Sequence, residues 1–128
     1  MEINYLWDTN TVIYYLQGLL SEDAEKLIDN ILLTTQPAIS AITEIELLCW
    51  RTAGENDLKL LRNFIGDSYV YELNREIKDQ TAELRKHHNL KLPDAIIAAT
   101  ALVNKLTLIT RNVKDFDKIS NLHLSNPF

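Results

Sequence analysis

Carboxylates follow two segments of this sequence that have the apolar pattern of buried strands. Asp8 comes directly after the segment 3–7, and Asp115 comes shortly after the segment 106–109. In open α/β sheets, ligands bind at the carboxyl ends of the strands. If these two strands are parallel neighbours, both acids open onto the same edge of the sheet.

The segment 42–51, which is expected to be helical, contains two glutamates, and helical geometry distinguishes between them. Successive helical residues are turned by about 100°, so Glu46 falls within an apolar arc while Glu44 points the opposite way. The arc consists of Ile45, Cys49, Trp50 and Ala53. Because an unpaired charge on a buried face is costly, we expect Glu46 to belong to a functional site.

Asp94 lies in the first turn of a helix expected to run from Pro93 to about Asn104. This helix is apolar nearly all round and rich in small residues, which predicts that it is buried against the sheet. An acid in the first turn is also favoured by the helix dipole, and Asp8 or Asp115 could simply cap a helix. The acids would form no functional site only if each of them had such a purely structural role.

Four carboxylates gathered in one pocket repel one another, and a hard divalent cation with oxygen ligands relieves that repulsion. An acidic site holding Mg²⁺, or alternatively Mn²⁺, is typical of in-line phosphodiester hydrolysis. The histidines do not have ligand spacing with Cys49, so nothing indicates zinc. The pattern therefore favours a metal-dependent enzyme that acts on phosphodiester bonds.

Strand-like and helix-like segments alternate along the whole sequence. This alternation predicts a single α/β domain over residues 1–128, with three layers and a mainly parallel central sheet of about four or five strands flanked by helices. The expected strands are 3–7, 37–40, 69–71, 106–109 and 122–124, and the expected helices lie between them.

The composition limits the possible environments and partners. Net charge is −5, so a nucleic-acid enzyme of this composition would need a local basic surface, bound cations or both. The single cysteine, Cys49, is expected in the core of a protein in a reducing compartment. Residues 1–4 do not resemble a secretory signal, and the apolar segment 94–103 is far shorter than the roughly 20 residues of a membrane span. We expect a cytoplasmic protein.

Four sequence motifs occur in order on the expected elements. They are W-D-T-N at 7–10, S-A-I-T-E-I-E-L at 40–47, L-P-D-A-I-I-A-A-T-A at 92–101 and L-T-L-I-T-R-N-V-K-D-F at 106–116. Over nearly its full length the chain resembles PIN domains of the VapC type, whose pattern Ser-x-Ile-Thr-x-x-Glu-Leu also selects Glu46. Many relatives have Gly soon after the Glu-Leu pair, whereas this sequence has Cys49-Trp50-Arg51 before Gly54.

The resemblance implies the toxin of a toxin–antitoxin pair: an endoribonuclease that leaves a 5′-phosphate and a 3′-hydroxyl, forms a homodimer and is inhibited by an antitoxin. Asp8 and Asp94 would be the main direct Mg²⁺ ligands, while Glu46 and Asp115 would bind the metal directly or through water. Thr110 and Asn112, first of all turn residues, would orient a water or a ligand carboxylate. The apolar segments 12–20 and 27–33 are candidate surfaces for the partner or the dimer.

Several other functions compete with this one, and the sequence excludes only some of them. A receiver-like signalling domain would need an acceptor Asp after a central strand, which segments 37–40 and 69–71 do not provide. A PIN-like module that binds RNA or protein without catalysis, a nuclease that targets DNA and a nuclease outside a toxin pair all remain open. The basic residues of segment 75–91 could contact RNA, although the interspersed acids favour a solvated helix face.

Overall fold

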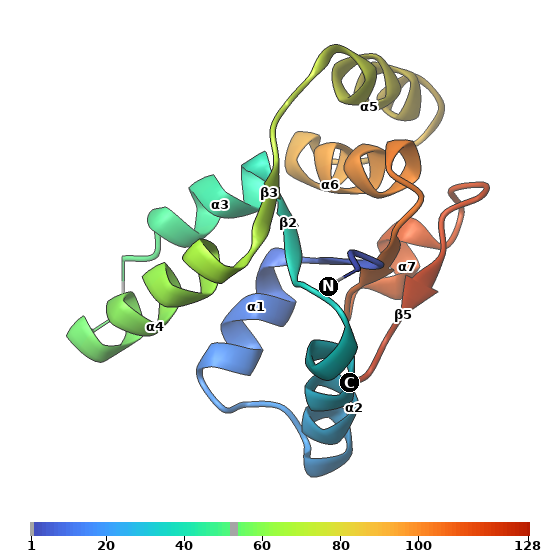
Figure 1. Cartoon of the computed structure of the whole chain (residues 1–128). Coiled ribbons are helices and arrows are strands. Elements are labelled where there is room, and N and C mark those ends of the chain that lie inside the picture. The colour runs from blue at the N-terminus through green and yellow to red at the C-terminus, as the bar shows by residue number, and fades with distance from the viewer. Residues whose placement is uncertain (1, 52–53) are drawn as a thin grey trace.

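The computed structural model describes residues 2–51 and 54–128, which form a parallel five-stranded sheet between helical layers (Figure 1). The strand order is β3-β2-β1-β4-β5, and every neighbouring pair is parallel. This confirms the predicted fold class. The strands are β1 (Tyr5–Trp7), β2 (Ala38–Ser40), β3 (Tyr69–Tyr71), β4 (Thr107–Ile109) and β5 (Leu124–Ser125). The helices are α1 (Thr9–Leu16), α2 (Glu22–Thr34), α3 (Ala41–Leu48), α4 (Glu55–Asp67), α5 (Arg75–His87), α6 (Leu92–Val103) and α7 (Val113–Phe116).

Two hydrophobic cores lie on opposite faces of the sheet because successive residues of a strand point to opposite sides. Leu6 and Leu108 pack with residues of α5, α6 and α7. Trp7 and Ile109, the next residues along β1 and β4, pack with residues of α1, α2 and α4. The predicted burial of α6 is confirmed, since its residues from Ala95 to Ala101 are all buried.

The central strands β1 and β4 end side by side. Trp7 pairs with Ile109 in the parallel register, so Asp8 and Thr110 follow the two strands at the same edge of the sheet. The chain leaves β1 toward β2 on one side, while β4 lies on the other, which makes this pair the point where the strand order reverses. Such a switch point is the usual ligand site of an open α/β sheet.

Two predictions about the helix that contains Glu44 and Glu46 are wrong. α3 ends at Leu48, so Trp50 lies beyond it, and Ala53 is outside the described residues. Ile45 is 55% exposed and Cys49 is also exposed, so the expected apolar arc is not buried and Cys49 is not a core residue. The buried positions of α3 are instead Thr43 and Leu47, which lie one turn apart and face α1 and its core.

Smaller observations concern the last strand and the end of α1. The last strand is Leu124–Ser125 rather than residues 122–124, and it pairs in parallel with β4 at the edge of the sheet. α1 ends at Leu16, near Gly18, because Gly18 adopts a φ of 68° and the amide of Leu19 then bonds back to the Tyr14 carbonyl. Within residues 2–51 and 54–128, no helix is long and apolar enough to cross a membrane.

Candidate active site at the carboxyl edge of the sheet

Asp8 is a buried carboxylate, only 6% exposed, between the ends of β1 and β4. Its Oδ1 accepts a 2.7 Å hydrogen bond from the Thr9 amide, which caps α1. Its Oδ2 accepts a 2.8 Å hydrogen bond from the Thr110 hydroxyl, which in turn accepts a bond from the Asn112 amide. Asp8 therefore does cap a helix, but its second oxygen is held across the switch point of the sheet.

A chain of hydroxyl groups fixes Glu46. The Thr9 hydroxyl donates to Glu46 Oε1 at 2.7 Å and also lies 3.0 Å from the Thr43 hydroxyl. A hydroxyl has a single proton, so donation to the carboxylate leaves Thr9 to accept from Thr43, which itself lies 3.1 Å from the Ser40 hydroxyl. The motifs at 7–10 and 40–47 contain Thr9, Ser40 and Thr43, but the sequence assigned these hydroxyl residues no role, although they stand at the starts of the two helices that follow β1 and β2.

Asp94 lies half-buried in the first turn of α6. Burial raises the pKa of its carboxyl above the ordinary value of 3.8, the negative charges of Asp115 and Glu46 raise it further, and Lys91 opposes them. Burial likewise raises the pKa of Asp8, and Asp94 and Glu46 add to that rise, against the hydrogen bonds from Thr110 and Thr9. Asp8, Glu46 and Asp94 therefore lie close enough for their charges to interact, and Asp115 joins them through its interaction with Asp94.

Asp115 is the most open of the four, since it is exposed on the short helix α7. Asn112 contributes its backbone amide rather than its side chain to the contact with Thr110. None of the ion pairs formed within residues 2–51 and 54–128 involves Asp8, Glu46, Asp94 or Asp115. Within the described part of the chain, Lys91 partly offsets the charge of Asp94, but none of the four acids is paired with a cationic side chain.

The donor set is suited to a hard cation that keeps much of its hydration shell. In the described residues, no three side chains of His, Cys, Asp or Glu form a group that could hold a metal ion. Mg²⁺ in proteins commonly keeps several waters and uses only one or two carboxylates. A pair of direct carboxylate ligands, with the other acids acting through water, therefore fits the arrangement better than four direct ligands.

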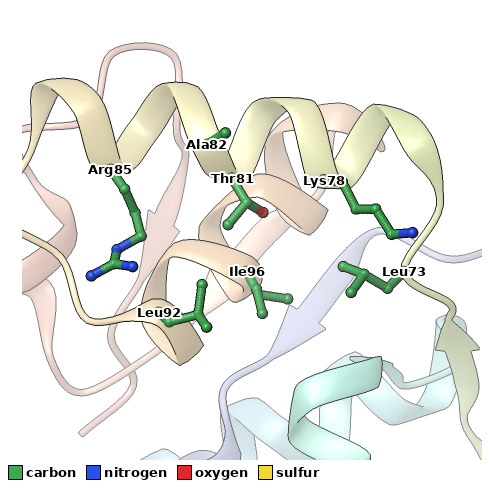
Figure 2. Close-up of a pocket in the computed structure, with 7 residues that line it drawn as sticks. All are labelled: Leu73, Lys78, Thr81, Ala82, Arg85, Leu92 and Ile96. Carbon is green, nitrogen blue, oxygen red and sulfur yellow. The ribbon is translucent and has the colours of Figure 1, made fainter.

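Of two cavities in the structure, one lies away from the four acids and the other is lined by Asp115. A cavity of about 420 Å³ between α5 and α6 contains none of the four acids and has mostly aliphatic walls, with Lys78 and Arg85 at opposite ends of its α5 side (Figure 2). A cavity of about 400 Å³ reaches the acidic edge through Asp115. Its lining residues are Arg111, Asn112, Val113, Lys114, Asp115 and Asn126.

Comparison with known families decides the classification. The model of the PIN domain matches residues 5–122, which is nearly the whole chain. The chain belongs to the PIN domain family. This confirms the resemblance seen in the four motifs, each of which lies inside the matched range.

Solved structures extend this relationship. The chain is similar to a chain of a toxin–antitoxin complex from Klebsiella pneumoniae, with 31% identity, a TM-score of 0.79 and 98% coverage of both chains. A DNA-bound VapBC structure from Salmonella typhimurium has 26% identity, a TM-score of 0.81 and coverage of 98% of this PIN domain and 99% of that chain. VapBC2 from Rickettsia felis shares the fold at 24% identity, with a TM-score of 0.81 and coverage of 97% and 98%. No sequence among the curated proteins matches significantly.

Proposed function

We propose that this PIN domain is a Mg²⁺-dependent endoribonuclease and the toxin of a toxin–antitoxin pair. The observation that carries the proposal is the buried carboxylate of Asp8, held at the switch point and repelled by Asp94 and Glu46 without a cationic partner among the described residues. Similarity to chains of toxin–antitoxin complexes supports the biological role.

Each residue of the site would have a distinct task. Asp8 and Asp94 would hold Mg²⁺, or Mn²⁺, which supplies an activated water and stabilises charge on the phosphate. Thr110 fixes the orientation of Asp8, and Thr9 fixes that of Glu46. Glu46 and Asp115 would accept hydrogen bonds from water in the site and so orient the attacking oxygen. The products would carry a 5′-phosphate and a 3′-hydroxyl.

The proposed protein partners are an inhibitory antitoxin and a second copy of the chain. Leu19, Leu27 and Leu33 leave much of their surface exposed on or beside α1 and α2, within the segments that the sequence marked as contact candidates. Large apolar side chains that stay exposed are candidates for contact with a protein partner. Activity in the cytoplasm is part of the same proposal.

Cleavage by the purified chain tests the proposal. We expect single-stranded RNA labelled at its 5′ end to be cut in Mg²⁺ but not after chelation of the metal, and DNA of the same sequence to persist. Induced expression should arrest bacterial growth. RNA that stays intact in both Mg²⁺ and Mn²⁺ while remaining bound would instead favour a PIN module without catalysis, and cleavage without growth arrest would favour a nuclease outside a toxin pair.

Replacement of Thr110 by valine tests how Asp8 is oriented. The change removes a buried hydroxyl but preserves the shape of the side chain, so Asp8 loses one of its two hydrogen bonds. Groups that orient metal ligands typically contribute about 10–100-fold to activity, and we expect a loss of that size in kcat/KM for RNA. Thr110→Ser is the matched control, because it keeps the hydroxyl and should retain most of the activity.

A further inference from the structure

Arg111 and Lys114 line the same cavity as Asp115. We infer that this cavity binds a phosphate group of the polynucleotide next to the cleaved one, with these two side chains as its ligands. The inference rests on the proposed nuclease function and adds the location of its phosphate contacts. It also gives a chain of net charge −5 a local positive surface for a polyanion, as such binding requires.

The cavity lies next to the acidic edge because residues of the two sites are neighbours in the sequence. Arg111 directly follows Thr110, whose hydroxyl holds Asp8, and Lys114 directly precedes Asp115. Both cationic side chains are exposed, and neither forms an ion pair within the described ranges 2–51 and 54–128. A strand that enters the acidic site therefore passes beside two available positive charges.

Arg111 is held in place before any ligand binds. Its Nη1 donates a 2.9 Å hydrogen bond to the Tyr14 hydroxyl, and its guanidinium carbon lies 5.5 Å from the Tyr14 ring centre and 6.0 Å from that of Phe128. A guanidinium has five N–H donors in a fixed plane, so the bond to Tyr14 leaves most of them for another acceptor. Such a pre-oriented fork is well matched to phosphate oxygens.

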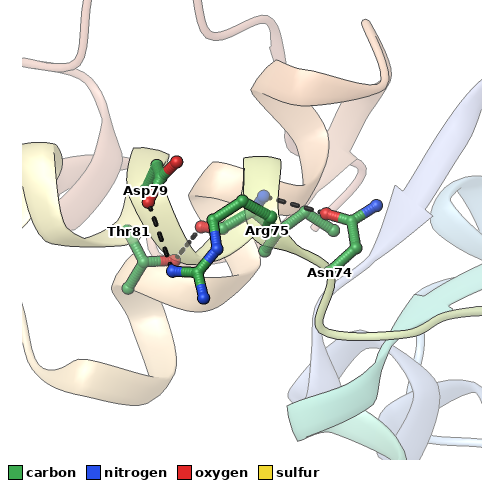
Figure 3. A network of polar contacts seen from close by, with 5 residues as sticks. Asn74, Arg75, Asp79 and Thr81 are labelled. Carbon is green, nitrogen blue, oxygen red and sulfur yellow. Dashed lines mark hydrogen bonds and ion pairs between the residues drawn. The ribbon is translucent and has the colours of Figure 1, made fainter.

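The cations of α5 are less suited to this role. Figure 3 shows Arg75 turned toward Asp79, with which it forms a 3.6 Å ion pair, and Lys86 pairs with Glu83 at 3.7 Å. These exposed pairs agree with the solvated helix face that the sequence indicated. The remaining cations, Lys78 and Arg85, border the aliphatic cavity of Figure 2, which contains none of the four acids.

Asp115 opposes phosphate binding, because its carboxylate lines the same cavity and repels an anion. A cation bound at the acidic edge would reduce this repulsion. We therefore expect the cavity to bind RNA more tightly in Mg²⁺ than in a chelator at equal ionic strength.

Salt dependence of RNA binding tests the inference. The parent chain in a chelator, in which it should not cleave, is titrated with a fluorescent single-stranded RNA over a range of salt concentrations. Arg111→Gln combined with Lys114→Gln in this chain should weaken binding at least about tenfold and lower the slope of log K against log salt by about 1.4, since each phosphate contact contributes about 0.7 on single strands. Lys118→Gln, which removes an exposed charge outside the cavity, should leave the slope unchanged.

Two further variants separate a phosphate contact from a structural role of Arg111. Arg111→Lys keeps the charge and should retain the slope, and Tyr14→Phe removes only the hydroxyl that accepts from Arg111 and should do the same. An unchanged slope in the double variant, or an equal loss in Lys118→Gln, would overturn the inference, as would absence of RNA binding by the starting chain. A parent chain that binds RNA with the expected slope but never cleaves it would refute the nuclease proposal alone.

Discussion

Replacement of Asp94 by asparagine is expected to reduce RNA cleavage by more than about 100-fold, because a proposed direct metal ligand should matter at least as much as the groups that orient such ligands. Asparagine has nearly the same shape and can still occupy the first turn of α6. The loss should therefore come from chemistry and not from unfolding. Initial rates of cleavage with saturating Mg²⁺ measure the effect, and circular dichroism checks the fold.

The matched control is Asp117→Asn, which removes a carboxylate just beyond α7 that has no part in the proposed site. This control should keep nearly full activity. Asp8→Asn should lose activity as Asp94→Asn does. Retention of parental rates by both Asp8→Asn and Asp94→Asn would show that the acidic edge is not the catalytic site.

Metal-free stability is expected to decline as the pH rises through the range in which Asp8 and Asp94 ionise. Burial raises the pKa of both groups in the folded chain above 3.8, so the native state binds protons more tightly than the unfolded state does. Stability from this source is complete below the unfolded pKa and is lost as the pH passes the higher, folded pKa. At neutral pH without metal, Asp94→Asn should therefore melt about 2–5 °C above the parent.

Mg²⁺ should reverse this order of stabilities. A ligand present at 100 times its Kd stabilises the folded state by about 2.7 kcal/mol, which corresponds to a rise in Tm of roughly 10 °C for a chain of this size. Asp94→Asn should lose most of that rise. Thermal melts of both chains at several pH values, with Mg²⁺ and with a chelator, measure the effect. A parent Tm that does not respond to Mg²⁺ or Mn²⁺ would contradict the linkage.

Much of the arrangement could be predicted because it follows from local patterns. Alternating strands and helices require a parallel sheet, and a parallel sheet places residues that follow its central strands at one edge. This is why Asp8 and Thr110 could be placed near each other although they are 102 residues apart. Asp94 could be placed from the apolar character of α6.

Glu46 shows the limit of such reasoning. The helical wheel selected it because of an apolar arc, but that arc is exposed or lies beyond the end of α3. What sets Glu46 apart in the structure is the Thr9 hydroxyl, which reaches it from a different helix. A contact between α1 and α3 depends on how the two helices pack, and a pattern within either segment does not contain that information.

The contacts that hold Arg111 could not be predicted from the sequence for the same reason. Its partners Tyr14 and Phe128 come from α1 and the end of the described chain, and only the folded sheet brings them together. The prediction that Cys49 lies in the core was wrong for a related reason. An apolar neighbourhood in sequence does not guarantee burial where a helix ends at the surface.

Anomalous diffraction from crystals of the protein soaked in Mn²⁺ would locate the proposed metal ion directly. We predict a peak at the carboxyl edge of the sheet, within coordination distance of Asp8 and Asp94, and the loss of this peak in Asp94→Asn crystals. An edge that stays free of metal at saturating Mn²⁺, or a peak bound only by acids elsewhere on the surface, would contradict the proposed metal site.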